Sequence, residues 1–194
     1  MPEIQVTLPD GSVKAFPQGT TPLAVGESIS SRLAAACFAA KCDGRMMDVY
    51  LPLAGDCRLE LVTDKSPEAL DVYRHSCAHL LANAVKELYP EAKIGIGPVI
   101  EDGFYYDFDR PEGTFTDQDL RKIEKVMREI VKANSPFRRE IVSRDEARRR
   151  FEAMGETYKV EIIEGIPEGE DISLYTHGAK GKEWTDLCAG PHVP

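Results

Sequence analysis

Two short segments of this chain place histidine and cysteine side chains at a spacing that can support chemistry. The chain has four histidines, and three of them, His75, His79 and His192, fall in these segments. His75 precedes His79 by four residues, and Cys188 precedes His192 by four residues. Residues four apart on a helix are neighbours, and Gly190-Pro191 favours a turn between the second pair. If the fold joins the segments, they line one polar cleft able to bind a metal or activate water.

The same side chains allow more than one chemistry. Three histidines and a cysteine can hold zinc, which is structural if they close its shell and catalytic if one position remains for water. The first segment has Ser76 where the metalloprotease motif needs glutamate, so it contains no general base for a metal-bound water. Without metal, the histidines can donate hydrogen bonds or move protons. An HxxxH pair also arises by chance, so the two segments alone leave these alternatives open.

The composition is that of a globular protein. The chain has 194 residues, of which 42% are hydrophobic and 29% are charged. This is enough for one large domain or two small ones. No run of about 18 apolar residues is present, so we expect no membrane span. The five cysteines lack a disulfide-framework spacing, which indicates reduced thiols and a cytoplasmic protein.

The charge is distributed unevenly along the chain. The net charge of −9 argues against general nucleic-acid binding. Between Arg121 and Arg150, however, eleven lysines and arginines face five acidic residues, a local charge of +6. Such a stretch can neutralise phosphates even on an acidic protein. A solvated helical surface has the same composition, so both interpretations stand.

The pattern of elements predicts two domains, residues 1–63 and 64–194, both of the α+β class. In the first, residues 4–8 and 13–16 predict a hairpin, residues 22–36 predict one helix, and residues 58–62 predict a closing strand. Asp43-Gly44 marks a tight turn between further strands. This is the order of a small ubiquitin-like β-grasp domain.

The second domain is expected to combine helices with a mainly antiparallel sheet. A helix is predicted to begin after Ser66 and to end before Pro90, with both histidines facing away from its apolar stripe. The stripe comprises Leu70, Tyr73, Cys77, Leu81, Ala84 and Leu88. A hairpin is expected over 94–108, helices are expected after Thr116 and Ser143, and strands are expected over 158–163 and near residue 174. His177 has no motif partner and is interpreted as structural or exposed.

Taken together, these residues resemble a known family. Three motifs carry the resemblance: His75-Ser-Cys-Ala-His79, then Gly97-Pro98 with Asp102-Gly-Phe-Tyr-Tyr-Asp107, and finally Asp186-Leu-Cys-Ala-Gly-Pro-His192. They look like the editing domain of threonyl-tRNA synthetases. Alanyl-tRNA synthetases share a related domain with the same histidine and cysteine pairs, but the preceding β-grasp (TGS) unit favours the bacterial threonyl family. The resemblance covers essentially the whole chain.

The resemblance implies post-transfer editing, the hydrolysis of the aminoacyl ester of mischarged seryl-tRNA(Thr). Serine and threonine differ by one methyl group, which a synthetic site discriminates by only about 1–3 kcal/mol. In the editing pocket the extra methyl of threonine would exclude it. Two alternatives remain: a non-catalytic tRNA-binding or regulatory module, and zinc-dependent editing of the alanyl type.

The resemblance also assigns roles to residues. The catalytic candidates are His75, Lys159 and Cys188. His75 would contact the reacting end through the ribose 2′-hydroxyl, Lys159 would orient water or stabilise the oxyanion, and Cys188 would position water or substrate without forming an acyl-enzyme. The substrate-binding candidates are His79, Tyr106, Asp186 and His192, with Asp186 expected to pair with the serine ammonium group.

By the same likeness, editing requires no metal, although His75, His79, Cys188 and His192 are the ligand set if zinc is bound. ATP and zinc are expected in a synthetic domain that this chain lacks, so we expect a fragment of a larger ligase. The expected partners are tRNA(Thr) and seryl-tRNA(Thr), with no membrane. The parent ligase is expected to be homodimeric and the fragment monomeric.

Overall fold

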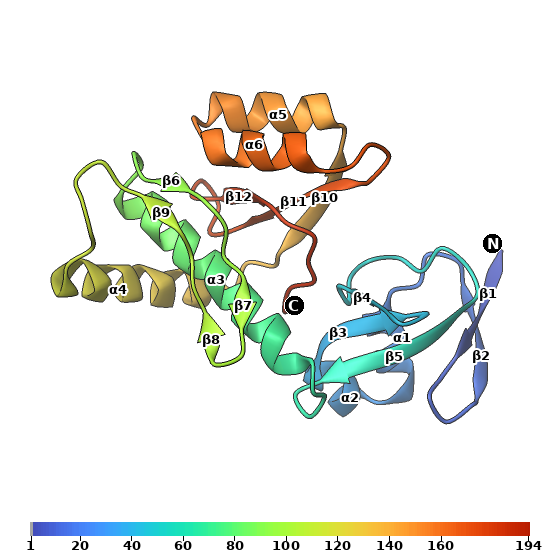
Figure 1. Cartoon of the computed structure of the whole chain (residues 1–194). Helices are drawn as coiled ribbons and strands as arrows, with labels where there is room; N and C mark the ends of the chain where they lie inside the picture. Colours follow the sequence, from blue (N-terminus) through green and yellow to red (C-terminus); the bar gives the residue numbers. More distant parts are fainter. Residues whose placement is uncertain (1) are drawn as a thin grey trace. The chain divides into compact units, whose positions relative to one another are not determined.

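The structure, a computed structural model, describes residues 2–194 and divides into two compact units (Figure 1). The first unit ends at Tyr73 and includes Gly190–Pro194, and the second unit is Arg74–Ala189. The predicted boundary after residue 63 lies ten residues before this division. None of the described helices is long and apolar enough to span a membrane.

The first unit has the predicted β-grasp fold. Its five-stranded sheet has the order β2-β1-β5-β3-β4, in which β1 and β5 are parallel and the other neighbours are antiparallel. The elements are β1 (Glu3–Thr7), β2 (Val13–Pro17), α1 (Pro22–Ile29), α2 (Ser31–Ala36), β3 (Cys37–Cys42), β4 (Arg45–Met47) and β5 (Cys57–Thr63). The alternating residues Ile4, Val6 and Leu59 point into one core, as the strand periodicity predicts. Asp43 and Gly44 have positive φ in the turn between β3 and β4.

The single helix predicted over residues 22–36 is wrong, because Ser30 divides it into α1 and α2. Ser30 has extended backbone angles, and its side chain accepts a hydrogen bond from the backbone N–H of Arg32. A serine side chain that bonds to nearby backbone favours a cap over the helix interior. The alanine and leucine content therefore predicts the helical propensity correctly but misses the break.

The second unit combines an antiparallel sheet, a long ribbon and four helices among its described residues. The sheet has the order β10-β11-β12, and the ribbon contains the pairs β6–β9 and β7–β8. The elements are α3 (Ala69–Leu88), which begins in the first unit, β6 (Lys93–Ile94), β7 (Val99–Ile100), β8 (Gly103–Phe104), β9 (Phe108–Asp109), α4 (Asp117–Ala133), β10 (Arg138–Val142), α5 (Arg144–Ala153), α6 (Thr157–Gly165), β11 (Ile172–His177) and β12 (Trp184–Leu187). Helices α5 and α6 lie side by side on one face of the sheet (Figure 1).

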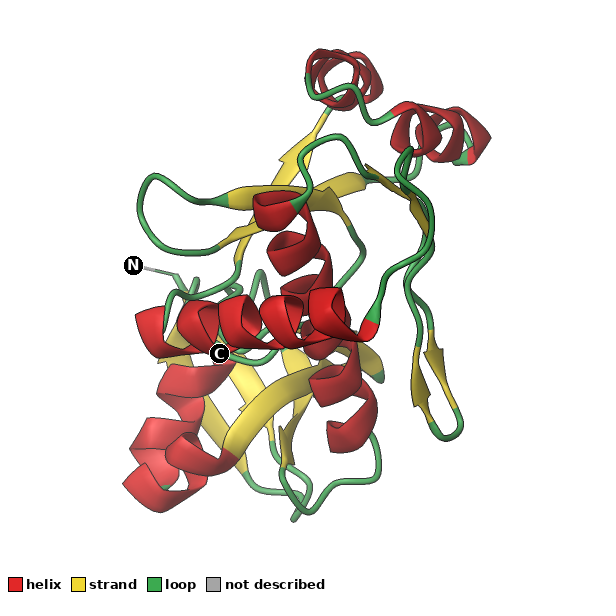
Figure 2. Cartoon of the chain, turned by 90° about the vertical axis from the view of Figure 1, so that its left-hand side faces the viewer, coloured by secondary structure: helices red, strands yellow, loops and turns green. Residues whose placement is uncertain are grey.

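Sequence signals set several boundaries in this unit. Thr116 caps α4 in a reciprocal capping box with Asp119, and Ser143 caps α5 by accepting from the backbone N–H of Glu146. Gly155 follows α5 with φ of +74°, which a glycine adopts without strain. The helices and the hairpin turn appear in red and green in Figure 2, where the β7–β8 hairpin extends from the rest of the ribbon.

Two predictions for the second domain are wrong. Residues 157–165 form helix α6 where the sequence pattern predicts a strand, because this segment packs against α5 through Ile163 and Phe151. On α3, Leu70 and Tyr73 of the predicted apolar stripe are 54% and 53% exposed, whereas His79 is buried. The apolar pattern fails there because the buried side of α3 also carries polar residues, among them Ser76 and Asn83.

Candidate active site

One cavity of about 430 Å³ in the second unit gathers side chains from α3, the ribbon, α6, β11 and β12. Six of the seven predicted site residues line it: His75, His79, Tyr106, Lys159, Asp186 and Cys188. They come from positions more than a hundred residues apart, so the tertiary fold assembles the site.

Helix α3 supplies the two histidines. His75 and His79 lie one turn apart, with ring centroids 5.0 Å apart in an edge-on arrangement. His79 is buried and its Nδ1 lies 3.8 Å from Oδ2 of Asp186. Burial, and then the neighbouring His75, His177 and Lys159, hold the pKa of His79 well below its usual value. The ring is therefore neutral at physiological pH.

Cys188 is held beside His75 by strand β11. Its Sγ lies 3.2 Å from Nε2 of His75. Its backbone N–H donates to the carbonyl of Ser173 at 3.1 Å, and the Ser173 hydroxyl donates to the Cys188 carbonyl at 2.5 Å. Ser173 thus fixes both backbone groups of Cys188. No signal in the sequence indicates this role, because a serine in a strand is common.

Asp186, Lys159 and Tyr106 form a buried polar cluster at the cavity wall. Lys159 Nζ lies 2.7 Å from Asp186 Oδ1 and 3.2 Å from the Tyr106 hydroxyl. The Tyr106 hydroxyl donates to Asp186 Oδ2 at 2.7 Å. Burial and the adjacent Asp186 raise the pKa of Tyr106 far above its usual range, so the phenol keeps its proton.

Gly97 makes room for Tyr106. A Cβ atom at residue 97 would lie 2.3 Å from Cδ2 of the Tyr106 ring, a distance that real contacts do not reach. The ring can therefore lie flat against the ribbon backbone only if position 97 is glycine. This gives a physical reason for Gly97 in the Gly97-Pro98 motif.

A buried ion pair fixes the start of α6, the helix that carries Lys159. Lys86 Nζ lies 2.7 Å from Oε1 of Glu156 and donates to the carbonyls of Pro90 and Ala92. The other oxygen of Glu156 accepts from the backbone N–H of Ile94 at 2.9 Å. These contacts connect α3 and β6 to the start of α6. Sequence reasoning missed both charged residues, whose only signal is a pair of opposite charges far apart in the chain.

The fourth histidine of the chain is also part of this region. His177 is buried, and its ring centroid lies 4.4 Å from that of Phe137 and 6.4 Å from that of His79. It donates to the backbone carbonyl of His79, and burial lowers its pKa to about 4. Nε2 of His177 has no partner among the described residues, so the donor is Nδ1. Of the two sequence interpretations, the structural one applies and the exposed one is wrong.

Three cavity residues also suit a metal ion. His75, His79 and Cys188 each offer one ligand atom, and these atoms all lie within 4.8 Å of one another. Imidazole nitrogen and thiolate sulfur are the donors that zinc prefers. The donor set therefore fits zinc, with His75, His79 and Cys188 as the residues that would hold it.

The remaining predicted residue, His192, groups with the first unit. Its backbone N–H donates to Oδ1 of Asp48 at 2.8 Å. The peptide bond between Gly190 and Pro191 is cis, and Gly190 has φ of +73°. Within the second unit, the site thus consists of the other six residues.

Comparison with known proteins identifies the relatives of this chain. A family described as the TGS domain matches residues 4–63. The threonine–tRNA ligase of Hyphomonas neptunium is 52% identical over 192 residues, which is 98% of this chain. By sequence, this chain is similar to the N-terminal part of bacterial threonine–tRNA ligases. Those of Thiobacillus denitrificans and Burkholderia multivorans are 53% and 52% identical, again over 98% of the chain. The chain spans 28% to 29% of the length of these threonine–tRNA ligases.

Proposed function

We propose that the chain hydrolyses the aminoacyl ester of mischarged seryl-tRNA(Thr), as the editing part of a threonine–tRNA ligase that works in the cytoplasm. The observation that carries this proposal is the cavity in which the Cys188–His75 contact and the Lys159–Asp186 pair lie together. A cationic, a thiol and an imidazole group around one cavity suit an ester whose hydrolysis develops negative charge on oxygen. The relationship to threonine–tRNA ligases supports a tRNA partner.

The proposed reaction needs only water and the ester. The water oxygen attacks the ester carbonyl carbon, the bond to the ribose oxygen breaks, and that oxygen receives a proton. Lys159 stabilises the charge on the carbonyl oxygen, and Cys188 positions the water. His75 contacts the ribose 2′-hydroxyl next to the ester, where its imidazole can hold or pass a proton.

The remaining cavity residues bind the seryl group. Asp186 pairs with its ammonium group, and Tyr106 orients Asp186 through the hydrogen bond of 2.7 Å. His79 is neutral and buried, so it shapes the wall without adding charge. His192 is proposed as a further substrate contact on family likeness alone. Threonine would be excluded by its extra methyl group, which a closely packed wall rejects.

A zinc-dependent version of the same reaction is the second candidate. It is favoured by the ligand atoms of His75, His79 and Cys188, which lie within 4.8 Å of one another. Zinc would supply a Lewis acid for the ester carbonyl. We propose the metal-free version because Lys159 already places a cation in the cavity. ATP and a second zinc site belong to the synthetic part of the proposed parent ligase.

The test is a deacylation assay on seryl-tRNA(Thr) and threonyl-tRNA(Thr), run with and without a zinc chelator. We expect hydrolysis of the seryl ester, little hydrolysis of the threonyl ester, and no effect of the chelator. Equal hydrolysis of both esters, or of neither, contradicts the editing function. Activity abolished by the chelator and restored by zinc favours the second candidate. Binding of tRNA without turnover favours a non-catalytic module.

A further inference from the structure

Both carboxylate oxygens of Asp186 are already engaged. Its Oδ1 accepts from the backbone N–H of Leu187 at 2.8 Å and lies 2.7 Å from Lys159 Nζ. Its Oδ2 accepts from the Tyr106 hydroxyl at 2.7 Å. The side chains of Lys159 and Asp186 are only 5% and 2% exposed. The carboxylate is therefore already paired with an ammonium group inside the cavity.

This arrangement conflicts with simple addition of a substrate ammonium group, if the proposed function holds. A seryl ester brings a second ammonium group to a cavity in which Asp186 is buried and has few accessible positions, whereas the other two lining carboxylates, Glu170 and Asp171, are exposed. A buried cation without a partner is unfavourable, and two cations sharing one buried carboxylate repel each other. An exchange keeps the carboxylate paired throughout, and the displaced Lys159 ammonium group moves toward the ester oxygen, on which negative charge develops.

The cavity allows Lys159 to leave this position. Its Nζ lies 3.2 Å from the Tyr106 hydroxyl, which can retain it after Asp186 is released. The lysine side chain has a flexible four-carbon stem. The cavity of about 430 Å³ extends from Lys159 to His75 and Cys188, where the proposed ester is cleaved.

We propose that Lys159 occupies the position on Asp186 that the substrate ammonium group takes, and that Lys159 moves toward the ester when that group binds. We call the Lys159–Asp186 pair a latch, because substrate binding separates its two side chains. The free amino group of the substrate is thereby a specificity determinant. A ligand without an ammonium group leaves Lys159 on Asp186, away from the carbonyl oxygen. Recognition of the amino acid and stabilisation of the oxyanion are coupled through one side chain.

The latch predicts an unusual effect of removing Lys159. Removing a residue that only contacts the substrate weakens binding, and so does removing a residue that only supports the fold. Removing a residue that competes with the ligand strengthens binding, because the competent state becomes more populated. If Lys159 occupies the position on Asp186 more than nine-tenths of the time, its removal tightens the binding of a ligand with an ammonium group about tenfold or more.

The experiment uses two stable amide analogues, 3′-seryl-amino-adenosine and the matched 3′-glyceryl-amino-adenosine, in which a hydroxyl replaces the ammonium group. Calorimetry measures their affinities for the wild-type chain and for Lys159→Met. We expect the variant to bind the seryl analogue about tenfold more tightly and the glyceryl analogue equally well. Asp186→Asn should weaken the binding of the seryl analogue only. Unchanged or weaker binding of the seryl analogue by Lys159→Met overturns the proposal, as does no binding to either protein.

A second measurement needs no variant and so does not depend on correct folding of Lys159→Met. In wild-type protein with isotope-labelled lysine, the Lys159 side-chain resonance should shift strongly with the seryl analogue and little with the glyceryl analogue. Equal shifts with both overturn the latch. The deacylation assay is separate: a chain that shows the exchange without hydrolysing seryl-tRNA(Thr) retains the latch and loses the proposed function.

Discussion

The Sγ atom of Cys188 lies 3.2 Å from Nε2 of His75, although 113 residues separate them in the sequence. Helix α3 supplies the imidazole, and the segment after β12 supplies the sulfur. Ser173 holds the backbone of Cys188 on both sides, so the contact is part of the fold and not of a flexible loop. The two side chains are therefore expected to act as one unit.

We expect His75→Ala and Cys188→Ala each to lower kcat/KM for seryl-tRNA(Thr) deacylation by about 10²–10³, typical for positioned groups. The double variant should lose much less than the product of the two effects, because either change removes the same unit. Cys77→Ala is the matched control, since Cys77 lies on the same helix outside the cavity lining. Strictly multiplicative effects in the cycle would show that the two residues act independently.

Gly97 and Gly103 provide a matched pair of glycine substitutions in the ribbon. A methyl group at Gly97 would collide with the Tyr106 ring at 2.3 Å, whereas one at Gly103 would meet nothing within 4 Å. We expect Gly97→Ala to lower the free energy of unfolding by about 1–3 kcal/mol and to impair deacylation by displacing Tyr106 from Asp186. Gly103→Ala should leave both nearly unchanged. Urea unfolding and kinetics check this, and equal behaviour of the two variants would refute the steric argument.

His177 should make the stability of the chain depend on pH. Burial lowers its pKa to about 4 from 6.5, so between these pH values the unfolded state binds a proton that the folded state excludes. The neutral His177 contributes fully to the free energy of unfolding above pH 6.5. As the pH falls toward 4, this contribution is lost and the free energy of unfolding decreases by about 3 kcal/mol. His177→Phe should reduce the pH dependence in this window, to which the buried His79 also contributes, when the free energy of unfolding is measured at about pH 7 and about pH 4.5.

His177→Asn provides the control for this experiment. It cannot titrate, but it retains a donor for the His79 carbonyl. It should share the reduced pH dependence while remaining more stable than His177→Phe at neutral pH. If wild type and both variants lose stability equally on acidification, His177 is not the titrating group.

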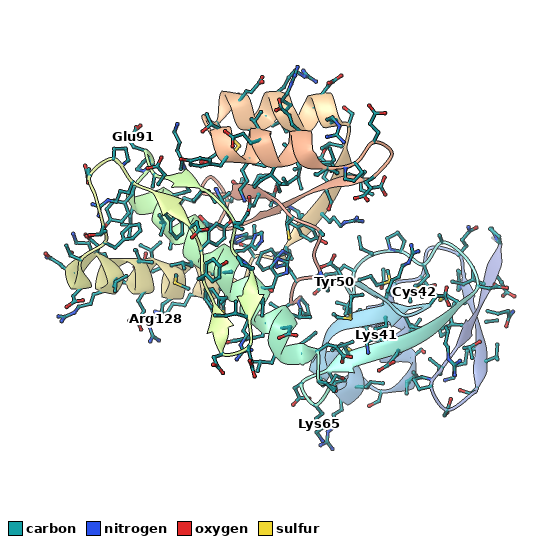
Figure 3. The ribbon with its side chains drawn as sticks, viewed as in Figure 1. Lys41, Cys42, Tyr50, Lys65, Glu91 and Arg128 are labelled. Carbon is teal, nitrogen blue, oxygen red and sulfur yellow. The ribbon has the colours of Figure 1, made fainter. Side chains whose placement is uncertain are left out.

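A cationic stripe on α4 is expected to contact the RNA backbone. Arg121, Lys125, Arg128 and Lys132 follow one another at helical spacing and are all exposed, opposite the buried Ile123. Figure 3 shows Arg128 projecting from α4, and its side chain is 73% exposed. Arg128 also pairs with Glu124, so the positive charge offered to RNA phosphates comes mainly from Arg121, Lys125 and Lys132.

Lys125→Gln combined with Lys132→Gln should weaken tRNA binding several-fold and reduce its salt dependence by about 0.9 in log–log slope for each phosphate that is no longer neutralised. Filter binding or anisotropy at a series of salt concentrations measures this. The exposed Lys180, in the loop between β11 and β12, is the control position for Lys→Gln. An unchanged slope in the double variant would show that these side chains are only solvated and do not contact RNA phosphates.

Local signals in the sequence determined much of the first unit and several helix boundaries. Alternating residues such as Ile4 and Val6 face one core because side chains of a strand alternate between its two faces. Thr116 and Ser143 cap their helices because a hydroxyl can satisfy a free backbone N–H only at that position. The residue types that could do chemistry were also evident, since few side chains can bind metal or move protons.

The tertiary structure alone decided which of those residues meet. Lys159 reaches Asp186 because residues 157–165 form a helix that packs on α5. The local alternation of residues had predicted a strand for this segment. His79 is buried because the elements packed on α3 cover its polar side, which an apolar pattern cannot indicate. The sequence thus identified the two segments that contain histidine and cysteine. Which of their side chains meet depends on long-range packing, because its energy outweighs weak local preferences.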